Sequence, residues 1–140
     1  MKILLAVDGS PCTKRMLAYL VTHEAWSAAG HQYVIFHGVP PLPHRAAAFA
    51  SPAEVRACYE DDAQRVLGPV RIFLERHGIE ATFLHKVCRP AREIARLATA
   101  RHFDLVIMGS HGRGKLGSVV MGSVATQVLA LCRTPVLIFR

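Results

Sequence analysis

The residues most able to do chemistry lie in a glycine-rich stretch, residues 109–123, which reads GSHGRGKLGSVVMGS. Glycines let a backbone approach a phosphate closely and point its N–H groups at it. Two cations, Arg113 and Lys115, stand among these glycines, and Ser123 can add a hydroxyl donor. The stretch therefore predicts contact with a phosphorylated ligand whose charge the two cations neutralise, the alternative being that both are solvated surface charges.

Two familiar phosphate-binding motifs overlap in this stretch, and each lacks a residue that its mechanism needs. Residues 109–115 nearly match the P-loop pattern G-x-x-x-x-G-K-[ST], but Leu116 has no hydroxyl for a magnesium ion. Residues 112–117 match the dinucleotide pattern G-x-G-x-x-G, which requires an acidic residue about 20 positions later for a ribose hydroxyl. No Asp or Glu follows Asp104 in the sequence, so neither motif is complete.

The elements that must position this stretch alternate between strand and helix. Short apolar runs predict strands at residues 3–7, 33–39, 79–87, 104–108 and 135–139. Helices are predicted at residues 11–29, 52–77, from 90 onward and 118–131, and residues 40–49 are predicted to form a loop. Strands linked by helical crossovers specify a parallel α/β sheet covered on both faces. We expect the whole chain, residues 1–140, to form a single domain.

Local signals mark several of the helix ends. Ser10 before Pro11 predicts a capped start for the first helix, and residues 51–54, Ser-Pro-Ala-Glu, form a capping box at the start of the second. Gly30 and Gly78 are predicted to end these helices. Pro69 lies inside the second helix and predicts a kink. The third helix is expected to bury one face, made of Ile94, Ala95, Leu97 and Ala98.

In parallel sheets, ligands bind beyond the carboxyl ends of the strands. Two polar loops containing glycine occupy such ends, residues 8–10 and 109–117, so the site is expected between them. The glycines also fit a third spacing, Gly109-x-x-Gly112, nine residues and then Gly122-Ser123. Together with Asp8, the opening MKILLAVDGS and the ending TPVLIFR, this pattern closely resembles the nucleotide-binding branch of the universal stress protein family. The resemblance spans essentially the whole chain.

That resemblance implies a doubly wound five-stranded sheet of order 3-2-1-4-5, similar to the adenine nucleotide alpha hydrolase fold. It implies binding of ATP, possibly with Mg²⁺, or of ADP or AMP. Asp8 would accept hydrogen bonds from the ribose hydroxyls, and the backbone at Gly38 and Val39 would read the adenine edge. Residues of the second loop and the following helix would supply the other contacts: Met108, Gly109, Gly112, Arg113, Gly122, Ser123 and Val124.

The family also implies a homodimer formed through the last strand, by Val136, Leu137, Ile138 and Phe139. As the end of the predicted sheet, this strand has an unpaired edge, which favours pairing with a second copy. One departure from the family pattern is Cys88-Arg89-Pro90, where G-x-P is frequent, and Cys88 is expected to crowd the base pocket. His111 could touch phosphate or sense pH, although an exposed loop histidine is the ordinary interpretation.

Composition narrows the class of protein. The 140 residues are 51% apolar and 19% charged, which excludes a disordered chain. No apolar run approaches the roughly 18–20 residues of a membrane helix, and the first run is too short for a secretory signal. Four scattered cysteines form no C-x-x-C pair, so neither a redox motif nor a zinc site is predicted. We expect free thiols and a cytosolic location.

Charge leaves three hypotheses for function. The net charge is +7, and residues 87–140 hold eight basic residues but only two acids, which favours a polyanionic partner or an arginine-rich solvated surface. We expect a stress-response sensor or regulator that binds nucleotide with slow or no hydrolysis, since no spare carboxylate lies near the loop. The alternatives are a nucleotide-free dimeric scaffold and a nucleic-acid binder, which lacks an aromatic cluster beside its arginines.

Overall fold

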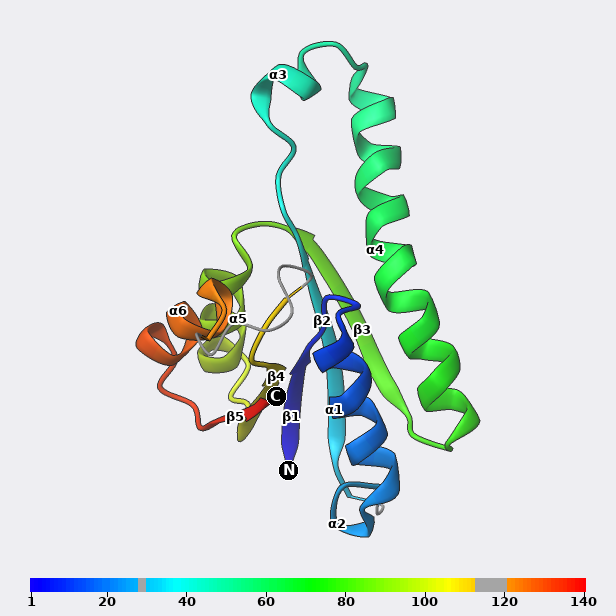
Figure 1. Cartoon of the computed structure of the whole chain (residues 1–140), viewed down its shortest axis with the longest axis vertical. Coiled ribbons are helices and arrows are strands. Elements are labelled where there is room, and N and C mark those ends of the chain that lie inside the picture. Colours follow the sequence, from blue (N-terminus) through cyan, green and yellow to red (C-terminus); the bar gives the residue numbers. More distant parts are fainter. Residues whose placement is uncertain (28–29, 113–120) are drawn as a thin grey trace.

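Five parallel strands form one sheet at the centre of the molecule (Figure 1). The computed structural model describes residues 1–27, 30–112 and 121–140. The strands are β1 (Lys2–Ala6), β2 (Gln32–Val39), β3 (Ala81–Val87), β4 (Leu105–Gly109) and β5 (Val136–Phe139). Their order is β3-β2-β1-β4-β5, which confirms the predicted doubly wound α/β fold. The central strand is β1, in which Leu5 is in register with Ile35 of β2 and Ile107 of β4.

Helices cover both faces of this sheet because its central strands are apolar on both sides. On one face, α1 (Pro11–Thr22) and α4 (Pro52–Arg76) pack against a core that includes Leu5, Ile35 and Ile107. On the other face, α5 (Pro90–Ala100) and α6 (Ser123–Leu131) pack against a core that includes Leu4 and Val106. The predicted buried face of α5 is confirmed, since Ile94, Ala95, Leu97 and Ala98 are all buried.

The first helix ends earlier than predicted. It stops at Thr22, because His23 takes an extended conformation, and the short helix α2 (Glu24–Ser27) follows. Side-chain contacts stabilise this end of the helix. Thr22 Oγ1 donates to the Ala18 carbonyl at 2.9 Å, and the His23 ring stacks on Tyr19 at 3.7 Å between ring centroids. The predicted continuation to residue 29 is wrong, because these local contacts compete with helical hydrogen bonding.

The region predicted as a loop at residues 40–49 contains one further short helix, α3 (His44–Ala47). The capping box then starts α4 as predicted. Ser51 Oγ accepts from the Glu54 N–H at 3.2 Å, and Glu54 Oε2 accepts from the Ser51 N–H at 2.7 Å. The helix runs through Pro69 without interruption to Arg76. In Figure 1, α3 and the first turns of α4 project beyond the carboxyl ends of the strands.

Two other boundaries differ from expectation. The strand predicted from residue 79 begins at Ala81, because the Ile79 N–H donates to the Leu74 carbonyl at 3.0 Å and so closes the end of α4. In the described part of the chain, α6 begins at Ser123, with Gly122 as its N-cap. Gly122 and Ser123 therefore lie at the start of the helix rather than one turn inside it. Along the described ranges, no helix combines the length and the apolar character needed to cross a bilayer.

Candidate functional site

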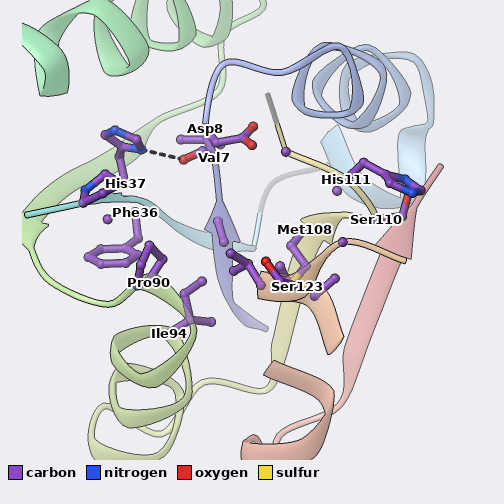
Figure 2. Close-up of a pocket in the computed structure, with 18 of the residues that line it drawn as sticks. Val7, Asp8, Phe36, His37, Pro90, Ile94, Met108, Ser110, His111 and Ser123 are labelled. Atoms are coloured by element: carbon purple, nitrogen blue, oxygen red, sulfur yellow. Dashed lines mark hydrogen bonds between the residues drawn. The ribbon is translucent and has the colours of Figure 1, made fainter. Parts of the chain in front are cut away.

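A cavity of about 530 Å³ lies at the carboxyl ends of β1, β2 and β4 (Figure 2). Ligand pockets in proteins measure roughly 300–1,000 Å³, so a nucleotide-sized molecule fits this volume. Both loops expected at the strand ends contribute to its walls, through Asp8 and through residues 109–112. The ends of the strands, the start of α5, the start of α6 and one residue of α4 also contribute. The site thus lies at the edge of the sheet where parallel α/β proteins bind ligands.

The first loop holds Asp8 in a fixed position. Asp8 Oδ1 accepts from the Ser10 N–H at 2.9 Å and from Thr13 Oγ1 at 2.8 Å. Ser10 in turn caps α1, because its Oγ accepts from the Thr13 N–H at 3.3 Å. The second carboxylate oxygen, Oδ2, faces the other loop, since a Cβ added to Gly112 would lie 2.9 Å from it. The two predicted loops therefore meet across the cavity at Asp8 and Gly112.

Two glycines of the second loop are required by close packing. A Cβ on Gly109 would lie 2.6 Å from the Cβ of Cys12 on α1. A Cβ on Gly122 would lie 3.0 Å from the Ser110 carbonyl oxygen and 3.3 Å from the Cα of His111. Glycine at these positions brings the loop against α1 and the start of α6 against the loop.

The backbone of Ser110 joins three elements beside the cavity. The Gly122 N–H donates to the Ser110 carbonyl at 2.8 Å, which anchors the start of α6. The Ser110 N–H donates to the Phe139 carbonyl at 2.6 Å, which ties the loop to β5. The Ser110 side chain contacts its neighbour, with Oγ 2.9 Å from His111 Nδ1. The position of the loop is therefore linked to both a helix and an edge strand.

The start of α6 offers backbone donors to the cavity. Its first helical hydrogen bond runs from the Thr126 N–H to the Gly122 carbonyl at 3.0 Å, so the N–H groups of Ser123 and Val124 have no acceptor within the helix. No side chain among the described residues caps this end. N–H groups without an acceptor in the helix and the positive end of the helix dipole favour an anion here.

The opposite part of the cavity is apolar. Its walls include Phe36 and Gly38 of β2 and Pro90 and Ile94 of α5, of which Phe36, Pro90 and Ile94 are labelled in Figure 2. A Cβ on Gly38 would lie 3.0 Å from the Pro90 ring, so only glycine lets the helix approach the strand this closely. Apolar walls of this kind suit an apolar part of a ligand.

Several predicted residues reach the cavity and others do not. Asp8, Gly38, Met108, Gly109, Gly112, Gly122, Ser123 and Val124 all line it. Val39 does not: it is buried, and its carbonyl accepts from the Cys88 N–H at 3.0 Å. Arg113 and Lys115 lie outside the described residues. Among the described residues, no group of three or more His, Cys, Asp or Glu side chains could hold a metal ion.

The cysteine expected to crowd the pocket takes a different position. Cys88 packs against the core on the α5 and α6 face and is not among the described residues that line the cavity. Burial, reinforced by the Glu93 carboxylate, raises the pKa of the Cys88 thiol. The expectation of crowding is therefore wrong, because the side chain enters the core instead of the pocket.

The thiol of Cys12 has a more polar environment. Burial disfavours its thiolate, but hydrogen bonding to the Arg15 guanidinium, at 3.3 Å from Sγ, and to His111 and Ser110 outweighs burial. The pKa of the Cys12 thiol is consequently lowered.

Sequence reasoning missed two ionisable residues of the cavity wall, His37 and Asp62. His37 lies on β2 with 4% of its surface exposed, and its Nδ1 is 2.9 Å from the Val7 carbonyl oxygen. Its Nε2 is 3.4 Å from Asp62 Oδ2 on α4. A single histidine in an apolar strand carries no motif, and its position near the carboxyl end of β2 was the one available signal.

Comparisons with known proteins agree with this arrangement. The family model described as the universal stress protein family matches residues 1–140. A universal stress protein of Thermus aquaticus is 32% identical over 139 residues, covering 99% of this chain and 97% of that protein. Universal stress protein Rv2005c of Mycobacterium tuberculosis is also 32% identical, over 145 residues, but the chain spans only 45% of its length.

Solved structures share the fold. Protein MJ0577 of Methanocaldococcus jannaschii superimposes with a TM-score of 0.82 at 24% identity, covering 99% of this chain and 94% of that one. An Arabidopsis thaliana family member solved with AMP bound gives 0.70 at 16% identity, with 99% and 90% covered. The Archaeoglobus fulgidus protein in complex with dAMP gives 0.70 at 20% identity, with 100% and 98% covered. The family model matches the whole chain, residues 1–140, and the sheet order agrees with the predicted family fold. The chain therefore belongs to the universal stress protein family.

Proposed function

We propose that this chain binds an adenine nucleotide in the cavity and acts as a sensor or regulator in a stress response. The observation that carries the proposal is the packing of Gly122 against Ser110 and His111, which brings the start of α6 to the cavity wall. Family members with AMP and with dAMP bound support the choice of ligand class. The four free cysteines suit the reducing cytosol, where we place the protein.

The cavity suggests how such a ligand would lie. The base would occupy the apolar part of the cavity, beside Gly38, Pro90 and Ile94. The ribose hydroxyls would donate to Asp8 Oδ2, on the side that faces Gly112. The phosphates would accept from the backbone N–H of Gly112 and from Ser123 and Val124 at the start of α6. Arg113 would complete their neutralisation, and an ATP would bring Mg²⁺ through its own phosphates.

We further propose that turnover is slow or absent. The carboxylates that line the described cavity are Asp8 and Asp62. Asp8 is held by Ser10 and Thr13 and has the ribose role, while Asp62 lies on α4 beside His37. Phosphoryl transfer needs a group that orients the attacking nucleophile at the phosphates, and Asp8, the acid that faces Gly112, would be engaged by the ribose. The bound state would then be read by a partner.

A second candidate function is a dimeric scaffold that needs no nucleotide. The observation in its favour is β5, which forms one edge of the sheet and has all four residues only partly buried. An edge strand with unpaired backbone groups favours pairing with a second copy. We propose a homodimer through this strand for both candidate functions. The presence or absence of nucleotide binding therefore distinguishes the sensor from the scaffold.

The test is direct measurement of nucleotide binding. Purified protein is denatured, released nucleotide is identified by mass spectrometry, and ATP, ADP and AMP are titrated by calorimetry. Gly122→Val should weaken binding by more than about tenfold, because a branched side chain displaces the Ser110 carbonyl. Gly68→Ala is the matched control, since a Cβ there meets nothing within 4 Å.

Three outcomes would contradict the proposal in different ways. Wild-type protein that neither carries nor binds nucleotide would favour the scaffold. Equal affinity in the Gly122→Val and Gly68→Ala variants would place the nucleotide elsewhere. Retention on nucleic acid that falls steeply with salt would favour the basic surface as the functional site.

A further inference from the structure

The exposed side of α5 carries arginines along its first two turns. Arg89 is the N-cap of the helix, and Arg92 and Arg96 follow it at spacings of three and four residues. All three are exposed, whereas residues 91 and 93–95 between them are buried. Side chains three and four residues apart share one side of a helix. These three residues, which we call the arginine face, therefore form one row on the surface.

The positive charge of the arginine face is not balanced by acids on α5 or on the adjacent helix α6. Glu93 is the acid of α5, and it is buried, accepting from Arg96 at 2.5 Å and from Lys86 of β3 at 3.2 Å. Within the described part of the chain, Arg89 and Arg92 form no ion pair. The helix α6, which packs beside α5, has no charged residue. The three arginines and Lys86 thus present four positive charges against a single buried carboxylate.

The size and chemistry of the arginine face favour carboxylates over nucleic acid. Guanidinium groups bind carboxylates and phosphates through paired hydrogen bonds, so an anionic partner is expected. From residue 89 to residue 96 a helix rises about 10 Å, at roughly 1.5 Å per residue. Tight binding of duplex DNA involves on the order of 6–10 phosphate contacts, more than this row can make. Binding of single strands relies on aromatic side chains that stack on bases, and neither α5 nor α6 contains one.

The arginine face lies on the helix that forms one wall of the cavity. Pro90 and Ile94 of α5 line the cavity and are labelled in Figure 2. Arg89 directly precedes Pro90 in the chain, and Arg92 lies between the two lining residues. None of the three arginines is among the described residues that line the cavity. A partner on the arginine face would therefore contact a cavity wall from outside without filling the cavity.

We propose that the arginine face docks an acidic segment of a partner protein. The inference goes beyond nucleotide binding and does not depend on it, because the contacts lie outside the cavity. Arg89 and Arg92 supply the interaction, each meeting a carboxylate of the partner. Arg96 adds charge to the row but also holds Glu93, so it stays unchanged in the experiment.

The experiment measures the affinity of a labelled acidic peptide by fluorescence anisotropy. The probe is an alanine-rich helical peptide with glutamates three and four residues apart, the spacing of the arginine face. Arg89→Glu combined with Arg92→Glu should weaken binding by more than about tenfold, because two attractive contacts become repulsive. The matched control is Arg56→Glu combined with Arg65→Glu, which reverses two exposed arginines of α4 and changes the net charge equally. This control should weaken binding by less than about threefold.

Two competitors separate this surface from other anion sites. Single-stranded oligothymidylate of the same charge should bind more weakly than the peptide, because the arginine face offers no ring on which a base can stack. Saturating AMP should change the affinity for the peptide by less than about twofold, since the two ligands would contact different residues. Circular dichroism checks folding, and glutamates at the start of α5 are compatible with the helix dipole. If the double variant is unfolded, Arg89→Gln with Arg92→Gln replaces it, with Arg56→Gln and Arg65→Gln as its control.

Four results would overturn the inference. The wild-type protein could fail to bind the peptide, or the two double variants could lose affinity equally, which would mean that only the overall charge attracts it. Tighter binding of oligothymidylate than of the peptide, lost in the Arg89 and Arg92 variant, would assign the surface to nucleic acid. Displacement of the peptide by AMP would place the peptide in the cavity. Calorimetry with AMP tests the proposed function separately, because a chain that binds the peptide on this face but no AMP contradicts only the proposed function.

Discussion

At the scale of single residues, the glycines of the second loop differ in what they do. Gly112 faces the carboxylate of Asp8, the flexible end of a side chain that can shift. Gly109 instead faces the Cβ of Cys12, which is fixed to the backbone of α1. The same pattern thus contains one glycine that shapes the ligand site and another that sets the distance between a strand and a helix.

Gly109→Ala should therefore destabilise the protein without a ligand present. A methyl group 2.6 Å from the Cβ of Cys12 forces β4 and α1 apart, and overpacking of this kind costs about 1–3 kcal/mol. Urea denaturation should show a lower midpoint for Gly109→Ala. The control Gly68→Ala adds the same methyl group in open space, so a midpoint as low as that of Gly109→Ala would contradict the explanation.

The sequence could predict most of the cavity because its residues follow strands directly. Asp8 comes after β1 and Gly109 ends β4, so a parallel sheet places both at one edge. Asp62 could not be found in this way. It comes from the middle of α4, and which turn of a long helix lies beside the cavity depends on packing that no local motif encodes. The contact of Cys88 with Val39 is also tertiary, and it removes Val39 from the ligand surface.

At the scale of elements, a charged cluster joins β3 to α5. Glu93 is buried at the start of α5 and accepts from Arg96 at 2.5 and 3.1 Å and from Lys86 of β3 at 3.2 Å. The hydrogen bonds from Arg96, followed by those from Lys86, lower the pKa of the Glu93 carboxyl despite its burial. Arg96, one of the eight basic residues counted in residues 87–140, therefore has a structural role.

Because its pKa is lowered on folding, Glu93 stabilises the protein above its unfolded pKa of about 4.3, and the effect disappears as the pH falls through the folded value. Both cations are more than half exposed, so the contribution is about 1 kcal/mol. Glu93→Gln should lower the free energy of unfolding by that amount at pH 7. The difference should shrink below about pH 4. A difference that stays constant down to pH 3 would contradict the assignment.

Element types and order followed from the sequence, whereas several boundaries did not. The capping box at Ser51 fixed the start of α4 because its partners lie three residues apart in the chain. The end of α1 depends on the ring stacking of Tyr19 and His23, which competes with a sequence that otherwise continues as a helix. The short helix α3 lies among prolines, where composition favours a loop.

At the scale of the whole molecule, the two edges of the sheet are protected differently. At the β3 edge of the sheet, α4 contacts both β2 and β3. On the opposite side, β5 packs against α1 through the ring of Phe139 on Tyr19, at 5.1 Å between centroids, and its residues remain partly exposed. Tyr19 itself is 39% exposed. This asymmetry supports β5 as the edge for self-association.

If the protein dimerises through β5, a charge on that strand should prevent it. Leu137→Asp should convert a dimer to a monomer in light scattering after size exclusion. Ile72→Asp is the control, because Ile72 is 51% exposed on α4, on the other side of the molecule. Circular dichroism checks that both variants are folded. A Leu137→Asp variant that stays dimeric would place the interface elsewhere, and dissociation by Ile72→Asp would do the same.

The backbone of Ser110 has a consequence for how these scales are coupled. Its carbonyl accepts from the N–H of Gly122, the residue before α6, and its N–H donates to the carbonyl of Phe139, the last residue of β5. The N–H and the carbonyl of Ser110 belong to two successive peptide groups, so a ligand that shifts this residue can lengthen the hydrogen bond to the helix, to the edge strand, or to both. Binding of a ligand in the cavity and pairing of β5 with a second copy would then be thermodynamically coupled. Saturating nucleotide would change the dissociation constant of a β5 dimer, and dimerisation would change the affinity for nucleotide by the same factor.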